Sequence, residues 1–177
     1  MQILAISGSL RAASTNTTLL KAAAALVPEG VMLNLYDGLG DLPHFNPDLD
    51  KDPPHAAVDE FRFHLRKSAG VIVSSPEYAH GVPGVLKNAL DWLVASGELY
   101  EKPVALFSAS PRANYAQASL METLAVMTAR VVSEASIVVP LLGKNVDENG
   151  IINDPDISRT LRSALIAFAN EISNHLR

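Results

Sequence analysis

Short apolar runs alternate with longer stretches of helical periodicity along the whole chain. Two of the runs, Val71-Ile72-Val73 and Ile137-Val138-Val139, are continuously apolar and rich in β-branched residues. Such runs are typical of strands covered on both faces, as in a parallel sheet. We predict strands at Gln2–Ser7, Val31–Tyr36, Gly70–Ser74, Pro103–Ser108 and Ser136–Pro140.

Apolar residues recur at spacings of three and four in the segments between and after these runs, which predicts amphipathic helices. In one segment Pro83 precedes the pattern and Gly97 follows it, the usual punctuation of a helix. Before the last segment, Asp154 or Asp156 is the expected N-cap. The predicted helices are Thr17–Leu26, Ala56–Lys67, Val85–Ala95, Gln117–Arg130 and Ile157–Leu176.

The alternation of strands and helices predicts an α/β fold, a doubly wound five-stranded parallel sheet with helices on both faces. We find no internal repeat and no linker composition, so we expect a single domain over residues 1–177. The functional crevice of such folds lies at the carboxyl ends of the strands, after Ser7, Ser74 and Ser108. Two further polar loops, 37–54 and 142–155, are long enough for lids or interfaces, although such loops also occur without a function.

Composition excludes several classes of protein. The 177 residues contain no cysteine, which rules out disulfides, thiolate nucleophiles and iron–sulfur clusters. A formal net charge of -5 disfavours nucleic acid as a partner, because nucleic-acid-binding surfaces are basic. No apolar stretch reaches the roughly 18 residues of a membrane span, and no leader precedes the first strand, so we expect a cytoplasmic protein. We expect no metal, because metal-ligand spacing is absent among the histidines at 44, 55, 64, 80 and 175.

The loop after the first strand has the composition of a phosphate site. Residues 7–18 are rich in hydroxyls and include Asn16 and Arg11, and no carboxylate precedes Glu29. A helix N-terminus carries unpaired N–H groups and about half a positive charge, which favours an anion. An ordinary capped helix would also use Ser, Thr and Asn. The loop lacks the Gly-Lys-Ser/Thr of a Walker motif and the second glycine of a dinucleotide fingerprint, so the phosphate of a mononucleotide is favoured.

The loop after the third strand predicts a site for a flat ring. Residues 75–84 include two prolines and two glycines, which make a stiff loop that a planar ligand can approach closely. Tyr78 offers a face or a wall, although loop packing would also account for Tyr78 and His80. Glu77 could cap or pair with the following helix, and we expect Trp92 to lie in the core or at a subunit interface. In a sheet of order 2-1-3-4-5 the first and third strands are neighbours, and FMN binds between them in flavodoxin-like folds.

The two loops together resemble the NADPH-dependent FMN reductase family, which includes quinone, chromate and azo-dye reductases. The resemblance is carried by Gly8-Ser9-Leu10-Arg11-x-x-Ser14-x-Asn16 and by the segment from Pro76-Glu77-Tyr78-x-His80-Gly81 through Lys87-Asn88-Ala89-Leu90-Asp91-Trp92. Further similarity lies at 42–49 and 147–150. The resemblance implies a flavodoxin-like fold, FMN as prosthetic group, NADPH or NADH as electron donor, and a homodimer or homotetramer.

The resemblance also implies which residues bind the cofactor. The phosphate would contact Ser9, Arg11, Ser14, Asn16 and Thr17. The isoalloxazine and ribityl groups would contact Pro76, Glu77, Tyr78 and His80, with Ser108 or Ser110 nearby. Two positions depart from the family pattern: Ala79 stands in place of an asparagine, and Arg112-Ala113-Asn114 stands in place of paired glycines. The resemblance implies that this second loop lines the ring side of the pocket.

We therefore predict an enzyme that transfers two electrons from NAD(P)H through FMN to a flavin, a quinone or a similar small acceptor. The flavin carries the chemistry, so we assign no catalytic side chain. The alternatives are a flavodoxin-type electron carrier and a regulatory flavin-binding module. Arg11 and the single aromatic residue of the ring loop count against the carrier, whereas the departures at Ala79 and Arg112 leave the module open.

Overall fold

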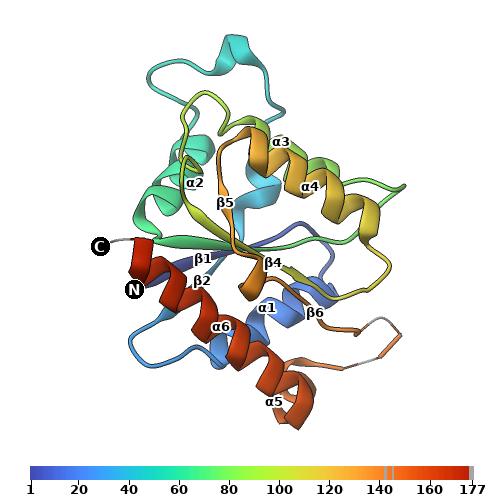
Figure 1. Ribbon diagram of the computed structural model, residues 1–177. Helices are drawn as coiled ribbons and strands as arrows, with labels where there is room; N and C mark the ends of the chain where they lie inside the picture. The colour runs from blue at the N-terminus through green and yellow to red at the C-terminus, as the bar shows by residue number, and fades with distance from the viewer. Residues whose placement is uncertain (142, 145, 176–177) are drawn as a thin grey trace.

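The computed structural model describes residues 1–141, 143–144 and 146–175, which form a parallel sheet between two layers of helices (Figure 1). The long strands are β1 (Gln2–Ser7), β2 (Met32–Tyr36), β3 (Gly70–Ser74) and β4 (Pro103–Ser108). The short strands β5 (Arg130–Val131) and β6 (Ile137–Val138) both pair with β4. The strand order β2-β1-β3-β4-β5 confirms the predicted flavodoxin-like topology.

Each face of the sheet has its own apolar core. The helices α1 (Thr15–Ala25), α5 (Glu148–Asn153) and α6 (Pro155–His175) cover one face, and α2 (Ala56–Lys67), α3 (Gly84–Asp91) and α4 (Asn114–Val126) cover the other (Figure 1). Successive residues of β1 alternate between the two cores: Ile3 and Ala5 belong to the first, Leu4 and Ile6 to the second. Burial on both faces is the reason that the strand is continuously apolar.

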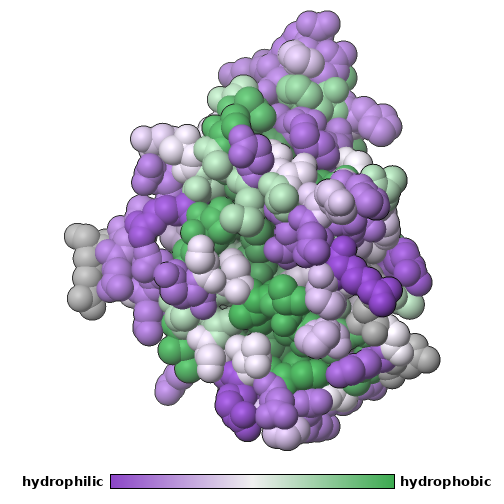
Figure 2. All heavy atoms as spheres, turned by 45° about the vertical axis from the view of Figure 1, so that its right-hand side comes forward, coloured by the Kyte–Doolittle hydropathy of each residue, from purple (hydrophilic) through white to green (hydrophobic). Residues whose placement is uncertain are grey.

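On the face turned forward in Figure 2, hydrophobic side chains form patches that are bordered by polar residues. No helix in the described part of the chain combines the length and the hydrophobicity needed to cross a bilayer.

The structure differs from the prediction at the edge of the sheet beyond β4. The sequence predicted a helix that ends at Arg130, followed by one strand at Ser136–Pro140, whereas α4 ends earlier and two short strands follow it. Thr128 takes a φ of 58°, and the amide of Ala129 donates to the carbonyl of Leu124 at 2.9 Å. These are features of a Schellman-type C-cap, so α4 ends at Val126. After α4, β5 pairs with the start of β4 and β6 pairs with the end of β4. The predicted strand at Ser136–Pro140 was partly right, because it contains β6.

Other helix boundaries also shift. The helix α1 begins at Thr15 because Ser14 is its N-cap, and α3 ends at Asp91, where turns rather than helix lead to Gly97. The loop predicted over 142–155 contains α5, and position 142 itself lies outside the described residues. Asp154 caps α6 as predicted, accepting from the amides of residues 156 and 157 at 3.0 Å. The predicted end of this helix at 176 also lies outside the described residues.

The long loop after β2 is fixed to α3 by side chains from the second sequence motif. Asn88 accepts a hydrogen bond from the amide of Phe45 at 2.7 Å and donates to the carbonyl of Pro43 at 3.0 Å. The indole of Trp92 donates to the same carbonyl at 2.8 Å, and Trp92 is only 1% exposed. Trp92 therefore lies in the core, which was one of the two places expected for it. The part of the motif that contains Asn88 and Trp92 thus serves the fold.

We predict that Asn88→Ala destabilises the protein by about 1–3 kcal/mol, because the half-buried amide of Phe45 loses its acceptor. The free energy of unfolding from urea denaturation measures the effect. Lys87→Ala is the neighbouring control, since among the described residues the Lys87 side chain forms only an exposed ion pair with Asp91, and such pairs contribute about 0–1 kcal/mol. Equal losses in the two variants would show that Asn88 does not anchor the loop.

Candidate functional site

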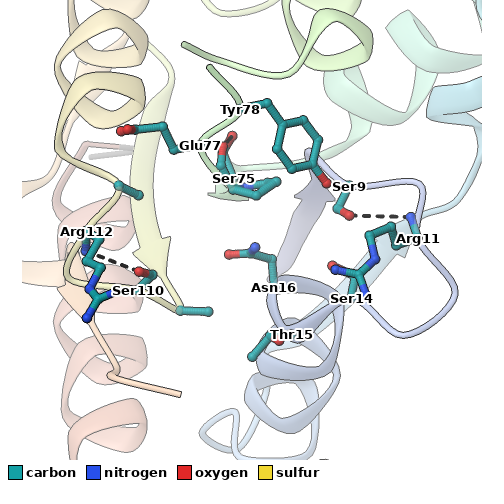
Figure 3. A pocket seen from close by; sticks show the side chains of 13 residues that line it. Ser9, Arg11, Ser14, Thr15, Asn16, Ser75, Glu77, Tyr78, Ser110 and Arg112 are labelled. Atoms are coloured by element: carbon teal, nitrogen blue, oxygen red, sulfur yellow. Dashed lines mark hydrogen bonds between the residues drawn. The ribbon is translucent and has the colours of Figure 1, made fainter. Parts of the chain in front are cut away.

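A pocket of about 380 Å³ opens at the carboxyl end of the sheet, between the loops that follow β1, β3 and β4 (Figure 3). Its volume falls in the range of small-molecule sites, roughly 300–1,000 Å³. The lining residues are Ser9, Arg11, Ser14, Thr15, Asn16, Ser75, Pro76, Glu77, Tyr78, Ala109, Ser110, Arg112 and Ala113. All three loops that the strand order predicted for the crevice therefore contribute.

The N-terminus of α1 forms one end of this pocket. The hydroxyl of Ser14 accepts a hydrogen bond from the amide of Thr17 at 3.3 Å, and the first turn contains no acidic residue. Thr15 and Asn16 of that turn line the pocket, and Asn16 is fixed by the hydroxyl of Ser74 at 2.9 Å. Arg11 is exposed at the same end. Uncompensated helix amides, hydroxyls and a guanidinium thus meet here, as a phosphate site requires.

Gly8 allows the loops after β1 and β3 to touch. A Cβ atom on this residue would lie 3.0 Å from Ser75 Oγ and 3.0 Å from a methyl group of Leu86. Its amide donates to the carbonyl of Ser74 at 2.8 Å, which ties the two loops at their bases. A side chain at this position would push apart two walls of the pocket.

The loop after β3 turns back sharply at the rim of the pocket. Tyr78 and Gly81 exchange two backbone hydrogen bonds, of 3.1 and 3.0 Å, across Ala79 and His80, whose φ angles are 50° and 59°. Two successive positive φ angles are the signature of a type I′ turn, which favours Asn and Gly. The backbone alone therefore gives a reason for an asparagine at position 79. Tyr78, half exposed, stands above the pocket (Figure 3).

Glu77 and His80 both contact α4. The Oε2 atom of Glu77 accepts hydrogen bonds from the amides of Tyr115 and Ala116, at 2.9 and 3.0 Å. The ring of His80 stacks on that of Tyr115 with centroids 4.3 Å apart. The interpretation of Glu77 as a helix cap was right about its role, but the helix is α4, not the following α3.

The loop after β4 repeats the local structure of the loop after β1. The segments 7–11 (SGSLR) and 108–112 (SASPR) share the pattern Ser-x-Ser-x-Arg. In each, the first serine hydroxyl accepts from the amide two residues on, at 3.4 and 3.3 Å, and the second accepts from the arginine amide, at 3.4 and 3.1 Å. We overlooked this short repeat, although it is visible in the sequence. It would have identified Arg112 as the counterpart of Arg11.

Among the predicted site residues, Thr17, His80 and Ser108, the last given as an alternative to Ser110, do not line the pocket. The hydroxyl of Thr17 instead bonds that of Ser7 at 2.7 Å. Of the two serines predicted near the ring, Ser110 lines the pocket, whereas Ser108 is buried behind it and bonds the carbonyl of Ser110. The lining residues that the prediction missed are Thr15, Ser75 and Ala109, whereas Arg112 and Ala113 belong to the loop that was expected at the ring side of the pocket.

Known proteins resemble this chain over most of its length. The family model described as NADPH-dependent FMN reductase matches residues 1–141. An NAD(P)H-dependent FMN reductase of Pseudomonas aeruginosa is 30% identical over 176 residues, which covers 95% of this chain and 93% of that protein. A quinone reductase of Escherichia coli is 28% identical, with 97% and 95% covered. The solved structure of FerB, a flavoenzyme NAD(P)H:(acceptor) oxidoreductase from Paracoccus denitrificans, superposes with a TM-score of 0.86 at 29% identity and 98% coverage of both chains.

We predict that Ala79→Asn raises the free energy of unfolding by about 0.5–1 kcal/mol, because asparagine tolerates the left-handed conformation better than alanine does. Urea denaturation of the protein without ligand measures the difference. Ala95→Asn is the control, since Ala95 is also exposed but does not have a positive φ. A loss of stability at position 79, or the same gain at both positions, would contradict the turn assignment.

Proposed function

The chain belongs to the NADPH-dependent FMN reductase family, and on that basis we propose an FMN-dependent oxidoreductase that passes two electrons from NAD(P)H to a quinone, a free flavin or a similar small acceptor. The observation that carries the proposal is the pocket itself. A helix N-terminus without acidic residues, supported by hydroxyls and Arg11, lies beside a stiff loop that carries Tyr78.

The side chains of the pocket fit a flavin mononucleotide. A phosphate monoester requires several N–H and O–H donors and a cation, which Ser9, Arg11, Ser14 and Asn16 supply around the first turn of α1. The space between the loops after β3 and β4 is lined by Pro76, Tyr78 and Ser110, and this is where we place the rest of the cofactor. Thr17 and His80 do not line the pocket, so we assign them indirect roles: Thr17 bonds the hydroxyl of Ser7, and His80 stacks on Tyr115.

The chemistry that FMN would supply when bound is two-electron transfer, with a hydride taken from NAD(P)H and two electrons passed to the acceptor. The chain binds and orients it: the hydroxyls and Arg11 fix one end, and the stiff loop holds the other. Tyr78 is half exposed at the rim, so we expect one open side at which the donor and the acceptor take turns. Such alternating occupancy gives ping-pong kinetics.

The names of the relatives are those of enzymes, which supports a reductase over a flavodoxin-type carrier or a regulatory module. A homodimer or homotetramer and a cytoplasmic location stay predictions.

We predict that Arg11→Ala weakens FMN binding roughly 10- to 100-fold, since a charge-assisted hydrogen bond contributes about 1.5–3 kcal/mol. Titration of the apo-protein with FMN, followed by flavin fluorescence, measures the affinity. The melting temperature without FMN should not change, because Arg11 is exposed and forms no ion pair within the described part of the chain. Arg159→Ala removes an exposed arginine of α6 and serves as the control. Wild-type affinity in Arg11→Ala would place the phosphate elsewhere.

The proposed function is tested by loading the purified protein with FMN or FAD and recording its absorbance after gel filtration. We expect FMN to be retained in preference to FAD, full reduction by one equivalent of NADPH or NADH without air, and sustained oxidation of the donor when a quinone is present. Initial rates should give parallel double-reciprocal lines. A preference for FAD, or no donor oxidation with any quinone, would overturn the proposal.

A further inference from the structure

The pocket has two ends that are built alike. Each Ser-x-Ser-x-Arg loop leads from the carboxyl end of a strand into a helix, α1 on one side and α4 on the other, and each places its arginine at the pocket. Neither helix has an acidic residue in its first turn. Figure 3 shows Arg11 and Arg112 at opposite sides of the pocket. By backbone structure and charge alone, both ends could attract an anion.

The two helix N-termini differ in what caps them. Ser14 caps α1 with a neutral hydroxyl from its own chain segment. The corresponding residue of α4 is Ala113, whose side chain makes no capping bond. The carboxylate of Glu77 takes over this role from the loop after β3, at 2.9 and 3.0 Å from two amides of the first turn. The stack of His80 on Tyr115 holds the same loop against the same helix.

This difference matters for a ligand with one charged end. A mononucleotide could enter a pocket with two anion-binding ends in either direction. A carboxylate already bonded to the amides of α4 occupies the donors that a phosphate would need, and its negative charge repels a second anion. The phosphate can then bind only at the α1 end of the pocket.

We propose that Glu77 sets the direction in which the mononucleotide binds, by filling the second anion site of the pocket. The inference rests on the proposed function, since it takes FMN as the ligand. Glu77 is a positioning residue that acts through α4. Arg112 does not serve as a phosphate ligand, because the Glu77 carboxylate already occupies the amides of the adjacent first turn of α4.

The test compares the affinities for FMN and for riboflavin, which lacks the phosphate, by flavin fluorescence. In the wild type, Arg11→Ala should remove most of the preference for FMN, and Arg112→Ala should change it less than twofold. In a Glu77→Ala background, the loss of FMN affinity caused by Arg11→Ala should be at least threefold smaller than in the wild type. In the same background, Arg112→Ala should weaken FMN binding severalfold. Glu77→Gln, whose amide oxygen can accept the same two bonds, should restore the wild-type dependence on the two arginines.

Asp154→Ala is the matched control for loss of a helix cap. Asp154 Oδ1 accepts from two successive amides of α6, both at 3.0 Å, in the same arrangement as Glu77 on α4. This variant should lose stability as Glu77→Ala does and keep the wild-type preference for FMN over riboflavin. If Glu77→Ala does not fold, equal effects of the two arginine variants in the wild-type background would still overturn the proposal.

The outcomes separate this inference from the function on which it rests. Equal effects of Arg11→Ala and Arg112→Ala in the wild type, or the same arginine dependence with and without Glu77, would overturn the role of Glu77 while FMN binding stands. A wild-type protein that binds FMN no better than riboflavin would overturn both.

Discussion

The unpaired amides at helix N-termini are the constraint from which the site follows. In a parallel sheet every helix enters from the carboxyl end of a strand, so the N-termini of α1 and α4 face the same edge as the pocket. Buried or partly buried amides need acceptors. The chain meets this need with a hydroxyl at α1 and with a carboxylate from another loop at α4. Of the amides at these helix N-termini, a ligand in the pocket can therefore bond only to those that the two caps leave unpaired.

The long second motif separates into two parts with different physical roles. Its first part, from Pro76 to Gly81, forms a wall of the pocket and contacts α4. None of the residues of its second part, from Lys87 to Trp92, lines the pocket. Asn88 and Trp92 instead hold the loop after β2 through the backbone of Pro43 and Phe45. The resemblance to a family of flavoenzymes therefore rests on residues that line the pocket and on residues that hold the fold, in one continuous segment.

Patterns that depend on local chemistry could be predicted from the sequence, and those that depend on tertiary contacts could not. Short apolar runs located the four long strands, and loop composition located most of the pocket. The end of α4 was missed because Thr128 adopts a left-handed conformation that glycine normally marks. The partner of Glu77 was missed because it lies 38 residues further along the chain, on a helix that only the fold brings near.

The two departures from the family pattern lie on opposite sides of one contact, that between the loop after β3 and the start of α4. Ala79 occupies the turn that carries Glu77 and His80, and Arg112 precedes the helix that these side chains touch. Where paired glycines would contribute no charge, Arg112 adds a cation to the end of the pocket that already holds the Glu77 carboxylate. The charges at that end offset one another, whereas Arg11 at the α1 end has no carboxylate beside it among the lining residues. The two ends thus differ in net charge although their backbones are alike and each has an arginine, and the difference is made by the carboxylate of Glu77, not by the fold.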